Sequence, residues 1–287
     1  MAQVDDYIGP YRLLSVVMTG QTSQVWEVID EGDRSRRAIK LLLSEFRKSK
    51  EHVGYLRQEY NVGRTLEHPR IVQIHELVSH QGSVCLVMEL FPFPNIKQAV
   101  INRGVKAWAH LLPRIITEAA EGLGYMHRKG WVHRDIKPDN YLVTPEGEVK
   151  LIDFALAQKA SGGGLLARLL AGKQKLQGTR SYMSPEQIRS RPLDARSDIY
   201  SFGCFVHELV TGKPPFTGTT SDELLNKHLR AAPPQLTAQE RNVTPEFADL
   251  VQRMLAKKPE KRPESLEHVL RELGKIRIFR ETPRAPA

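Results

Sequence analysis

The spacing of apolar residues changes near residue 90, and this change constrains the fold more than any other feature of the chain. Before it, short runs rich in β-branched residues are typical of strands in a sheet. After residue 95, apolar residues recur every three or four positions, which is typical of amphipathic helices. Strand and helix patterns segregated in this way predict an α+β fold, with a small β-rich lobe and a larger helical lobe.

The first lobe is expected to be a five-stranded antiparallel sheet with one helix. The expected strands are Tyr11–Thr19, Gln24–Asp30, Arg36–Leu43, Ile71–Val78 and Val84–Leu90. The helix is expected over Ser44–Leu66, because this stretch is charged, lacks proline and is followed by His68-Pro69. We place an N-terminal lobe at residues 1–90, a C-terminal lobe at residues 91–274 and a basic C-terminal tail at residues 275–287.

The second lobe is expected to be mainly helical. The expected helices are Trp108–Arg128, Ala195–Thr211, Asp222–Leu229, Glu246–Ala256 and Glu264–Leu273, and two short strands are expected at Tyr141–Val143 and Val149–Ile152. The tail after these helices is expected to be a solvated end of the chain.

Composition narrows the class of protein. A chain of 287 residues that is 40% hydrophobic and 26% charged is typical of a soluble globular protein. Its two cysteines, Cys85 and Cys204, lie in apolar runs, which excludes a disulfide framework and predicts a reducing, cytoplasmic location. No apolar run reaches the ~18–20 residues that a spanning helix needs, so no membrane span is expected.

A set of short strings follows a fixed order along the chain. The strings are Arg37-Ala38-Ile39-Lys40, Glu59, His133-Arg134-Asp135-Ile136-Lys137-Pro138-Asp139-Asn140, Asp153-Phe154, Gly178-Thr179, Tyr182–Glu186, Asp198–Gly203 and Lys261-Arg262-Pro263. In kind and order they resemble the eukaryotic-type (Hanks-type) Ser/Thr protein kinases, over roughly residues 11–274. The resemblance implies the bilobal protein kinase fold, and the string Tyr182–Gln187 favours a bacterial member.

The resemblance also implies a reaction and assigns roles to residues. The reaction is phosphoryl transfer from ATP to Ser/Thr hydroxyls of protein substrates, with Asp135 as the base and Lys137 beside it. Lys40, held by Glu59, would bind the phosphates. Asn140 and Asp153 would bind Mg²⁺, or Mn²⁺ in its place, because hard cations take oxygen ligands. The nucleotide would contact Met18, Gly20, Val25, Ala38, Lys40, Met88, Glu89, Phe91 and Leu142.

Three residues are expected to support this site. By the same resemblance, Asp198 would accept hydrogen bonds from the loop that carries Asp135. Glu186 and Arg262 would form a buried ion pair that ties the segment after Gly178 to the helical lobe.

The chain departs from the family pattern at three places. The nucleotide loop keeps Gly20 but has Met18 and Ser23 where glycines are usual, and Ala155 replaces the glycine of D-F-G. Gly63, one turn after Glu59, places no side chain where the family often builds a hydrophobic stack, which predicts a mobile helix. These departures leave open a second function, a pseudokinase that serves as a nucleotide-binding interaction module. A small-molecule phosphotransferase is disfavoured, because such enzymes lack a segment like Gly178–Glu186.

Residues 161–177 form the least family-like stretch. Three glycines precede a leucine-rich basic run, and no Ser, Thr or Tyr occurs from 162 to 177, so the hydroxyls nearby are Ser161, Thr179, Ser181 and Tyr182. Two interpretations remain open: a docking element for the lobe or for a regulatory partner, and an ordinary disordered loop.

The net charge of +9 is concentrated rather than spread. Residues 154–185 hold five Lys/Arg residues and no Asp or Glu. This distribution argues against nucleic acid as a partner and favours either acidic residues near the phosphoacceptor of a protein substrate or an acidic docking partner.

Overall fold

The computed structural model describes residues 7–160 and 177–285 of the chain. Its contacts divide the chain into two compact units. The first unit comprises Met1–Phe93 and Asp153–Ala155, and the second comprises Pro94–Ile152 and Leu156–Ala287. The short turn Asp153–Ala155 therefore belongs with the N-terminal unit, although the chain on both sides of it belongs to the other.

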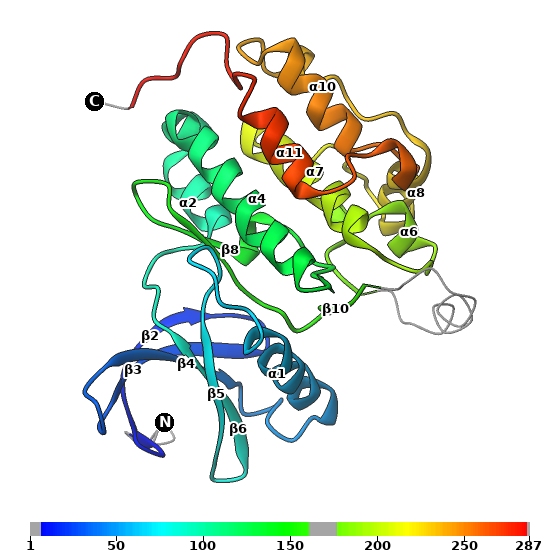
Figure 1. Cartoon of the computed structure of the whole chain (residues 1–287). Helices are drawn as coiled ribbons and strands as arrows, with labels where there is room; N and C mark the ends of the chain where they lie inside the picture. The colour runs from blue at the N-terminus through cyan, green and yellow to red at the C-terminus, as the bar shows by residue number, and fades with distance from the viewer. Residues whose placement is uncertain (1–6, 161–176, 286–287) are drawn as a thin grey trace. The chain divides into compact units, whose positions relative to one another are not determined.

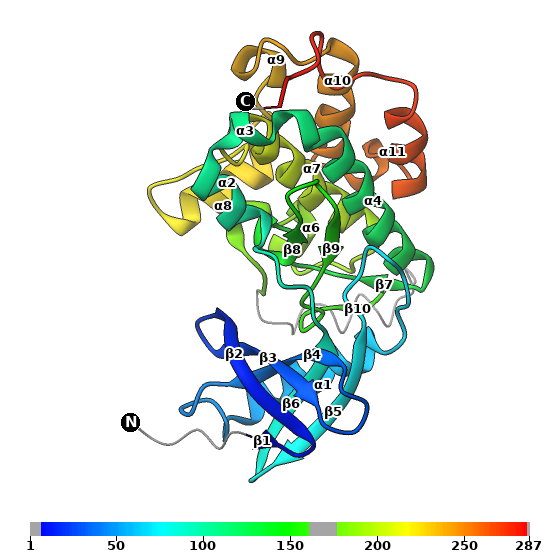
Figure 2. The same ribbon diagram turned by 90° about the vertical axis from the view of Figure 1, so that its left-hand side faces the viewer.

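The first unit is built on an antiparallel sheet with the strand order β1-β2-β3-β4-β6-β5 (Figure 2). The strands are β1 Tyr7–Ile8, β2 Tyr11–Thr19, β3 Ser23–Asp30, β4 Arg36–Leu42, β5 Ile74–His80 and β6 Ser83–Glu89. The five expected strands are present, with β5 beginning at Ile74 rather than Ile71. A sixth strand of two residues, β1, was not expected, and it pairs with the beginning of β2.

One face of this sheet carries a buried apolar cluster. Its members are Ile8, Tyr11, Val28, Ile39, Cys85 and Val87. Cys85 is a free thiol within this cluster, and burial raises its pKa to about 11. It packs as a small hydrophobic residue, as the sequence predicts.

Helix α1, Lys50–Gly63, packs against β5 and β6 (Figure 1). It is shorter than the expected 44–66 because Ser49 caps it, accepting a hydrogen bond from the backbone N–H of His52 at 3.4 Å. The buried residues of the helix are Leu56, Glu59, Val62 and Gly63. A buried glutamate on this face requires a cationic partner, which the site below supplies.

The second unit is mainly helical. Its helices are α2 Ile96–Arg103, α3 Val105–Trp108, α4 Leu112–Arg128, α6 Pro185–Ile188, α7 Ala195–Thr211, α8 Ser221–Arg230, α9 Leu236–Gln239, α10 Pro245–Met254 and α11 Leu266–Leu273. Helix α7 is the centre of this unit, because every residue from 197 to 210 is buried. Helix α10 packs on α7, and α11 lies along α4 (Figure 1).

Short strands and turns carry the loops of the second unit. β8, Tyr141–Val143, pairs with β9, Val149–Leu151, as predicted, and this hairpin lies beside α4 (Figure 2). β7, Trp131–Val132, pairs with β10, Gln158–Lys159. Within residues 7–160 and 177–285, no helix is both long enough and apolar enough to cross a bilayer.

The C-terminal segment is not a solvated end, in contrast to the expectation. Ile278 and Phe279 are buried. The backbone N–H of Thr244 donates to the carbonyl of Ile278 at 3.0 Å, and that of Arg280 donates to the carbonyl of Asn242 at 2.7 Å. Two buried apolar residues in an otherwise basic stretch explain why this part of the tail packs beside the start of α10.

Candidate active site

Lys40 on β4 forms a buried ion pair with Glu59 on α1. The Lys40 Nζ atom lies 2.7 Å from Glu59 Oε2 and 3.9 Å from Asp153 Oδ1, and all three residues belong to the first unit. Burial opposes the charge on Lys40, but the carboxylates of Asp153 and Glu59 outweigh it and raise the Lys40 pKa above its usual value. Burial raises the pKa of the Glu59 carboxyl, against the lowering effect of Lys40. The pair thus keeps a cation beside Asp153.

Asp153 adopts an unusual backbone conformation. Its φ is 66°, in the left-handed region that residues other than glycine rarely adopt. Such a conformation costs about 1–3 kcal/mol and persists only where the surroundings impose it. Ala155 does not have a positive φ, so its Cβ atom is compatible with this turn.

Gly63 allows Ile74 and Phe154 to approach α1 closely. A Cβ atom at position 63 would lie 2.2 Å from Ile74 Cγ1 and 3.3 Å from Phe154 Cδ2. Phe154 is fully buried, and it follows Asp153 directly. Ile74 therefore occupies the space that a side chain on the helix would otherwise fill, so the missing side chain leaves no gap that would loosen α1.

We predict that Gly63→Ala destabilises the protein by about 1–3 kcal/mol, because the added methyl overpacks this contact. Gly54→Ala in the same helix is the matched control, since nothing lies within 4 Å of its added Cβ. The control should stabilise by about 0.5–1 kcal/mol. Urea unfolding measures both changes, and equal effects of the two substitutions would contradict the packing account.

Most of the predicted nucleotide-binding residues share one face of the sheet. In the strand register, Met18 lies opposite Val25, Val25 opposite Lys40, and Ala38 opposite Met88. Residues two apart on a strand point to the same side, so these five side chains line one surface.

The other predicted nucleotide contacts lie outside that row. Gly20 lies in the β2–β3 turn, where its N–H donates to the carbonyl of Ser23 at 2.8 Å. Glu89 and Phe91 belong to the end of the first unit, and Leu142 belongs to the second. Val17, an exposed apolar residue in the β2 bulge beside Met18, was not among the predicted contacts.

The second unit brings together Asp135, Lys137, Asn140 and Thr179. Asp135 Oδ1 accepts the backbone N–H of Thr179 at 2.7 Å, and Oδ2 lies 2.7 Å from Lys137 Nζ. The side-chain amide of Asn140 donates to the Asp135 backbone carbonyl at 2.7 Å. Lys137 also donates to Thr179 Oγ1 at 2.8 Å. The carboxylate of Asp135 is therefore fixed on both oxygens, by a backbone amide and by a cation.

Asp198 holds the loop that carries Asp135. This fully buried carboxylate on α7 accepts the backbone N–H groups of His133 at 2.7 Å and Arg134 at 2.9 Å, as expected. It also contacts His127 Nε2 at 2.9 Å, a partner that the sequence did not reveal. Burial would raise the Asp198 pKa, but the hydrogen bond and charge of His127, with the loop contacts, hold it below its usual value.

Arg134 and Gly178 explain how two loops approach each other. Arg134 has a φ of 74°, and its carbonyl accepts a hydrogen bond from Gln187 Nε2 at 2.8 Å. Gly178 has a φ of 110°, and a Cβ there would lie 3.0 Å from the Arg134 carbonyl oxygen. Glycine at 178 is thus required both by its conformation and by this close contact.

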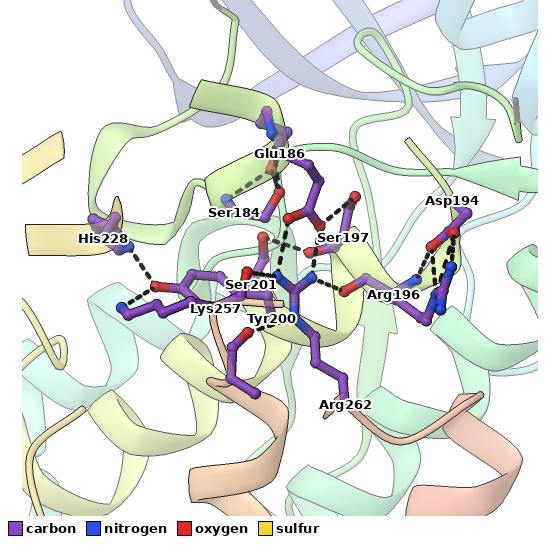
Figure 3. A network of polar contacts seen from close by, with 12 residues as sticks. Ser184, Glu186, Asp194, Arg196, Ser197, Tyr200, Ser201, His228, Lys257 and Arg262 are labelled. Atoms are coloured by element: carbon purple, nitrogen blue, oxygen red, sulfur yellow. Dashed lines mark hydrogen bonds and ion pairs between the residues drawn. The ribbon is translucent and has the colours of Figure 1, made fainter. Parts of the chain in front are cut away.

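Glu186 and Arg262 form the buried ion pair that the sequence predicts (Figure 3). The pair is bidentate, with distances of 2.6 and 2.9 Å, and Ser197 Oγ donates to the same carboxylate at 2.7 Å. Arg262 also donates to the backbone carbonyls of Arg196 and Ala256. These contacts satisfy the hydrogen-bonding groups of both buried charges. Because Ser197 and Arg196 lie on α7, the pair ties segment 178–186 firmly to this helix.

A second polar group lies beside this pair in Figure 3. Tyr200 OH contacts His228 Nδ1 at 3.0 Å and accepts from Lys257 Nζ at 3.2 Å. Burial lowers the pKa of His228 to about 4, with a further effect from the Lys257 charge, and burial lowers that of Lys257 to about 8. His228 is therefore neutral in the folded protein near pH 7.

We predict that His228 makes the protein acid-sensitive. Because its folded-state pKa lies below the usual value of 6.5, its contribution to stability is complete above pH 6.5 and is lost as the pH falls toward 4, by about 2–3 kcal/mol. His228→Gln should flatten the dependence of unfolding free energy on pH in this window. An unchanged slope in His228→Gln would contradict the assignment.

The family of the chain follows from this geometry together with sequence comparison. The family model "Protein kinase domain" matches residues 11–272. The chain belongs to the protein kinase family, which confirms both the predicted resemblance and the predicted fold class.

Bacterial serine/threonine-protein kinases are among its relatives. It is 32% identical to "Serine/threonine-protein kinase PknA" of Mycobacterium tuberculosis over 281 residues, which cover 96% of this chain and 63% of that protein. It is 31% identical to "Serine/threonine-protein kinase PknL" of the same species, covering 87% of this chain and 61% of PknL. For "Probable serine/threonine-protein kinase pknA2" of Bifidobacterium longum the identity is also 31%, covering 93% and 35%. The chain thus spans less than two thirds of the length of these relatives.

Proposed function

We propose that this chain transfers the γ-phosphoryl group of ATP to Ser or Thr hydroxyls of protein substrates. The observation that carries the proposal is the fixed Asp135 carboxylate, which contacts both Lys137 and the backbone of Thr179. A carboxylate fixed in this way can accept the proton of an incoming hydroxyl group and orient the oxygen of that group. The adjacent ammonium group of Lys137 stabilises negative charge that develops on the transferred group.

Lys40, Asp153 and Asn140 have the chemistry that a metal–nucleotide complex requires. Lys40 offers a charged donor for phosphate oxygens. Asp153 offers a carboxylate whose side chain is 39% exposed. The amide nitrogen of Asn140 is engaged by Asp135, which leaves its oxygen for a cation. Each of these two oxygen groups is of the kind that Mg²⁺ prefers, and a bound Mg²⁺ would neutralise phosphate charge.

A bound cation would take most of its ligands from outside the protein. Among the residues that the structure describes, no group of three or more His, Cys, Asp or Glu side chains could hold a metal ion. Mg²⁺ commonly binds through one or two protein groups, phosphate oxygens and water, so this ligand supply fits nucleotide-dependent binding.

Replacing Asp135 tests the proposal directly. Asp135→Asn should lower kcat for phosphate transfer from Mg·ATP to a generic protein substrate by about 10²–10⁴-fold, because the base is lost. Asp139→Asn is the matched control, since Asp139 is an exposed carboxylate in the same loop. Equal activity in Asp135→Asn and the unsubstituted protein, or none in either, would overturn the proposal. Nucleotide binding without transfer would instead identify a pseudokinase.

Gly20 offers a test of the nucleotide loop that is separable from folding. A Cβ at this position would meet only the Ser23 carbonyl oxygen, at an ordinary 3.4 Å, so Gly20→Ala should fold normally. If the backbone of this turn approaches a phosphate, the methyl group will raise KM for ATP by about 5-fold, which corresponds to about 1 kcal/mol. An unchanged KM in a variant with unchanged thermal stability would remove Gly20 from the binding site.

The structure restricts where regulatory phosphate could be added. Thr179 Oγ1 accepts from Lys137, and Tyr182 OH is buried and donates to Glu208. Two of the four nearby hydroxyls, those of Thr179 and Tyr182, therefore already have hydrogen-bond partners. Ser161 and the rest of segment 161–177, apart from Gln177, lie outside the described residues, so the two interpretations of this segment stay open. A regulatory partner at 161–177 and a cytoplasmic location remain predictions from the sequence.

A further inference from the structure

Segment 178–186 runs past the carboxylate that would receive the substrate hydroxyl. The N–H of Thr179 donates to Asp135 Oδ1 at 2.7 Å, and Arg180 is the next residue. An extended peptide rises about 3.3 Å per residue. The length of an arginine side chain is about that of two such residues. Because Arg180 directly follows the residue whose N–H binds Asp135, the substrate residues within two positions of the acceptor are the candidates for contact with its guanidinium.

Arg180 is exposed and its charge is not neutralised. Its Nη1 atom donates to Ser221 Oγ at 2.6 Å, which is a neutral partner at the start of α8. Among the described residues, no carboxylate lies within ion-pair distance of Arg180. The neighbouring acid Glu223 is engaged by Lys227 at 2.7 Å and by Thr219 at 2.8 Å. The contact with Ser221 orders the guanidinium and leaves its other donors available.

The carboxylate under the same segment is already occupied. Glu208 on α7 is buried, accepts the hydroxyl of Tyr182 and pairs with Lys97 Nζ at 2.5 Å. Lys97 itself is 41% exposed in its side chain. Glu208 is therefore unable to serve a basic substrate side chain, and its ion pair with Lys97 leaves Arg180 as the cation of this segment without a carboxylate partner among the described residues. Two exposed carboxylates oppose this trend, Asp139 in the loop of Asp135 and Asp222 in the first turn of α8.

We propose that Arg180 selects protein substrates with an aspartate or glutamate within two residues of the phosphoacceptor. This inference rests on the proposed function and names the residue that sets its substrate class. A guanidinium that is ordered but unpaired recognises carboxylates with two parallel hydrogen bonds. The same positive charge disfavours lysine or arginine at that place, so selection acts through both attraction and repulsion.

Peptide kinetics test this proposal. Matched threonine peptides carry Asp or Lys at each single position from −2 to +2, and kcat/KM is measured for the unsubstituted protein, Arg180→Gln and Arg180→Glu. The unsubstituted protein should prefer Asp by at least ~10-fold at one position, and added NaCl should reduce the preference. Arg180→Gln should abolish the preference and Arg180→Glu should reverse it.

Controls separate this inference from the function on which it rests. Arg189→Glu, an exposed charge reversal at the C-terminal end of α6, should keep the preference for Asp. No transfer to any peptide or generic protein by the unsubstituted protein would overturn both proposals. Transfer without preference, or a preference that survives in Arg180→Glu, would overturn the role of Arg180 alone. Arg180→Gln keeps the test valid if Arg180→Glu fails to fold, because loss of preference is then the readout.

Discussion

The hydrogen bonds to the Asp198 carboxylate are the constraint on which the helical unit depends. One buried side chain on the central helix fixes two successive backbone amides, and the loop that follows them can place Asp135 with little freedom. Arg134 can keep its left-handed backbone because this anchor and Gln187 hold both sides of its peptide unit. The structural role of Asp198 and the catalytic role proposed for Asp135 thus fall on different residues, since Asp198 is fully buried and Asp135 is partly exposed.

The same division appears in the N-terminal unit. Glu59 is buried and fixes Lys40, whereas Lys40 faces the partly exposed Asp153. In each unit a deeply buried acid positions the group that would meet the ligand. In each unit the more deeply buried charge therefore lies on the positioning acid rather than on the group proposed to bind the ligand.

Sequence reasoning predicted most of the fold and the two clusters of polar residues. Helix α7 was predicted with its observed bounds, because Asp194 caps its beginning and Gly212, with a φ of 76°, ends it. Helices α2, α3, α6 and α9 were missed, because they are at most eight residues long and have little periodicity. The contact of His127 with Asp198 joins residues 71 positions apart, which periodicity does not reveal. The packing of the tail was not predicted. Its basic residues indicated a solvated end, although Ile278 and Phe279 are apolar.

The contact between Gly63 and Ile74 has a consequence for how this sequence can change. The two positions share one volume, so a larger residue at 63 is acceptable only after position 74 has become smaller. Substitution at either position is unfavourable while the other position is unchanged. The order of the two substitutions therefore matters. Gly63 and Ile74 are therefore expected to occur together in related sequences.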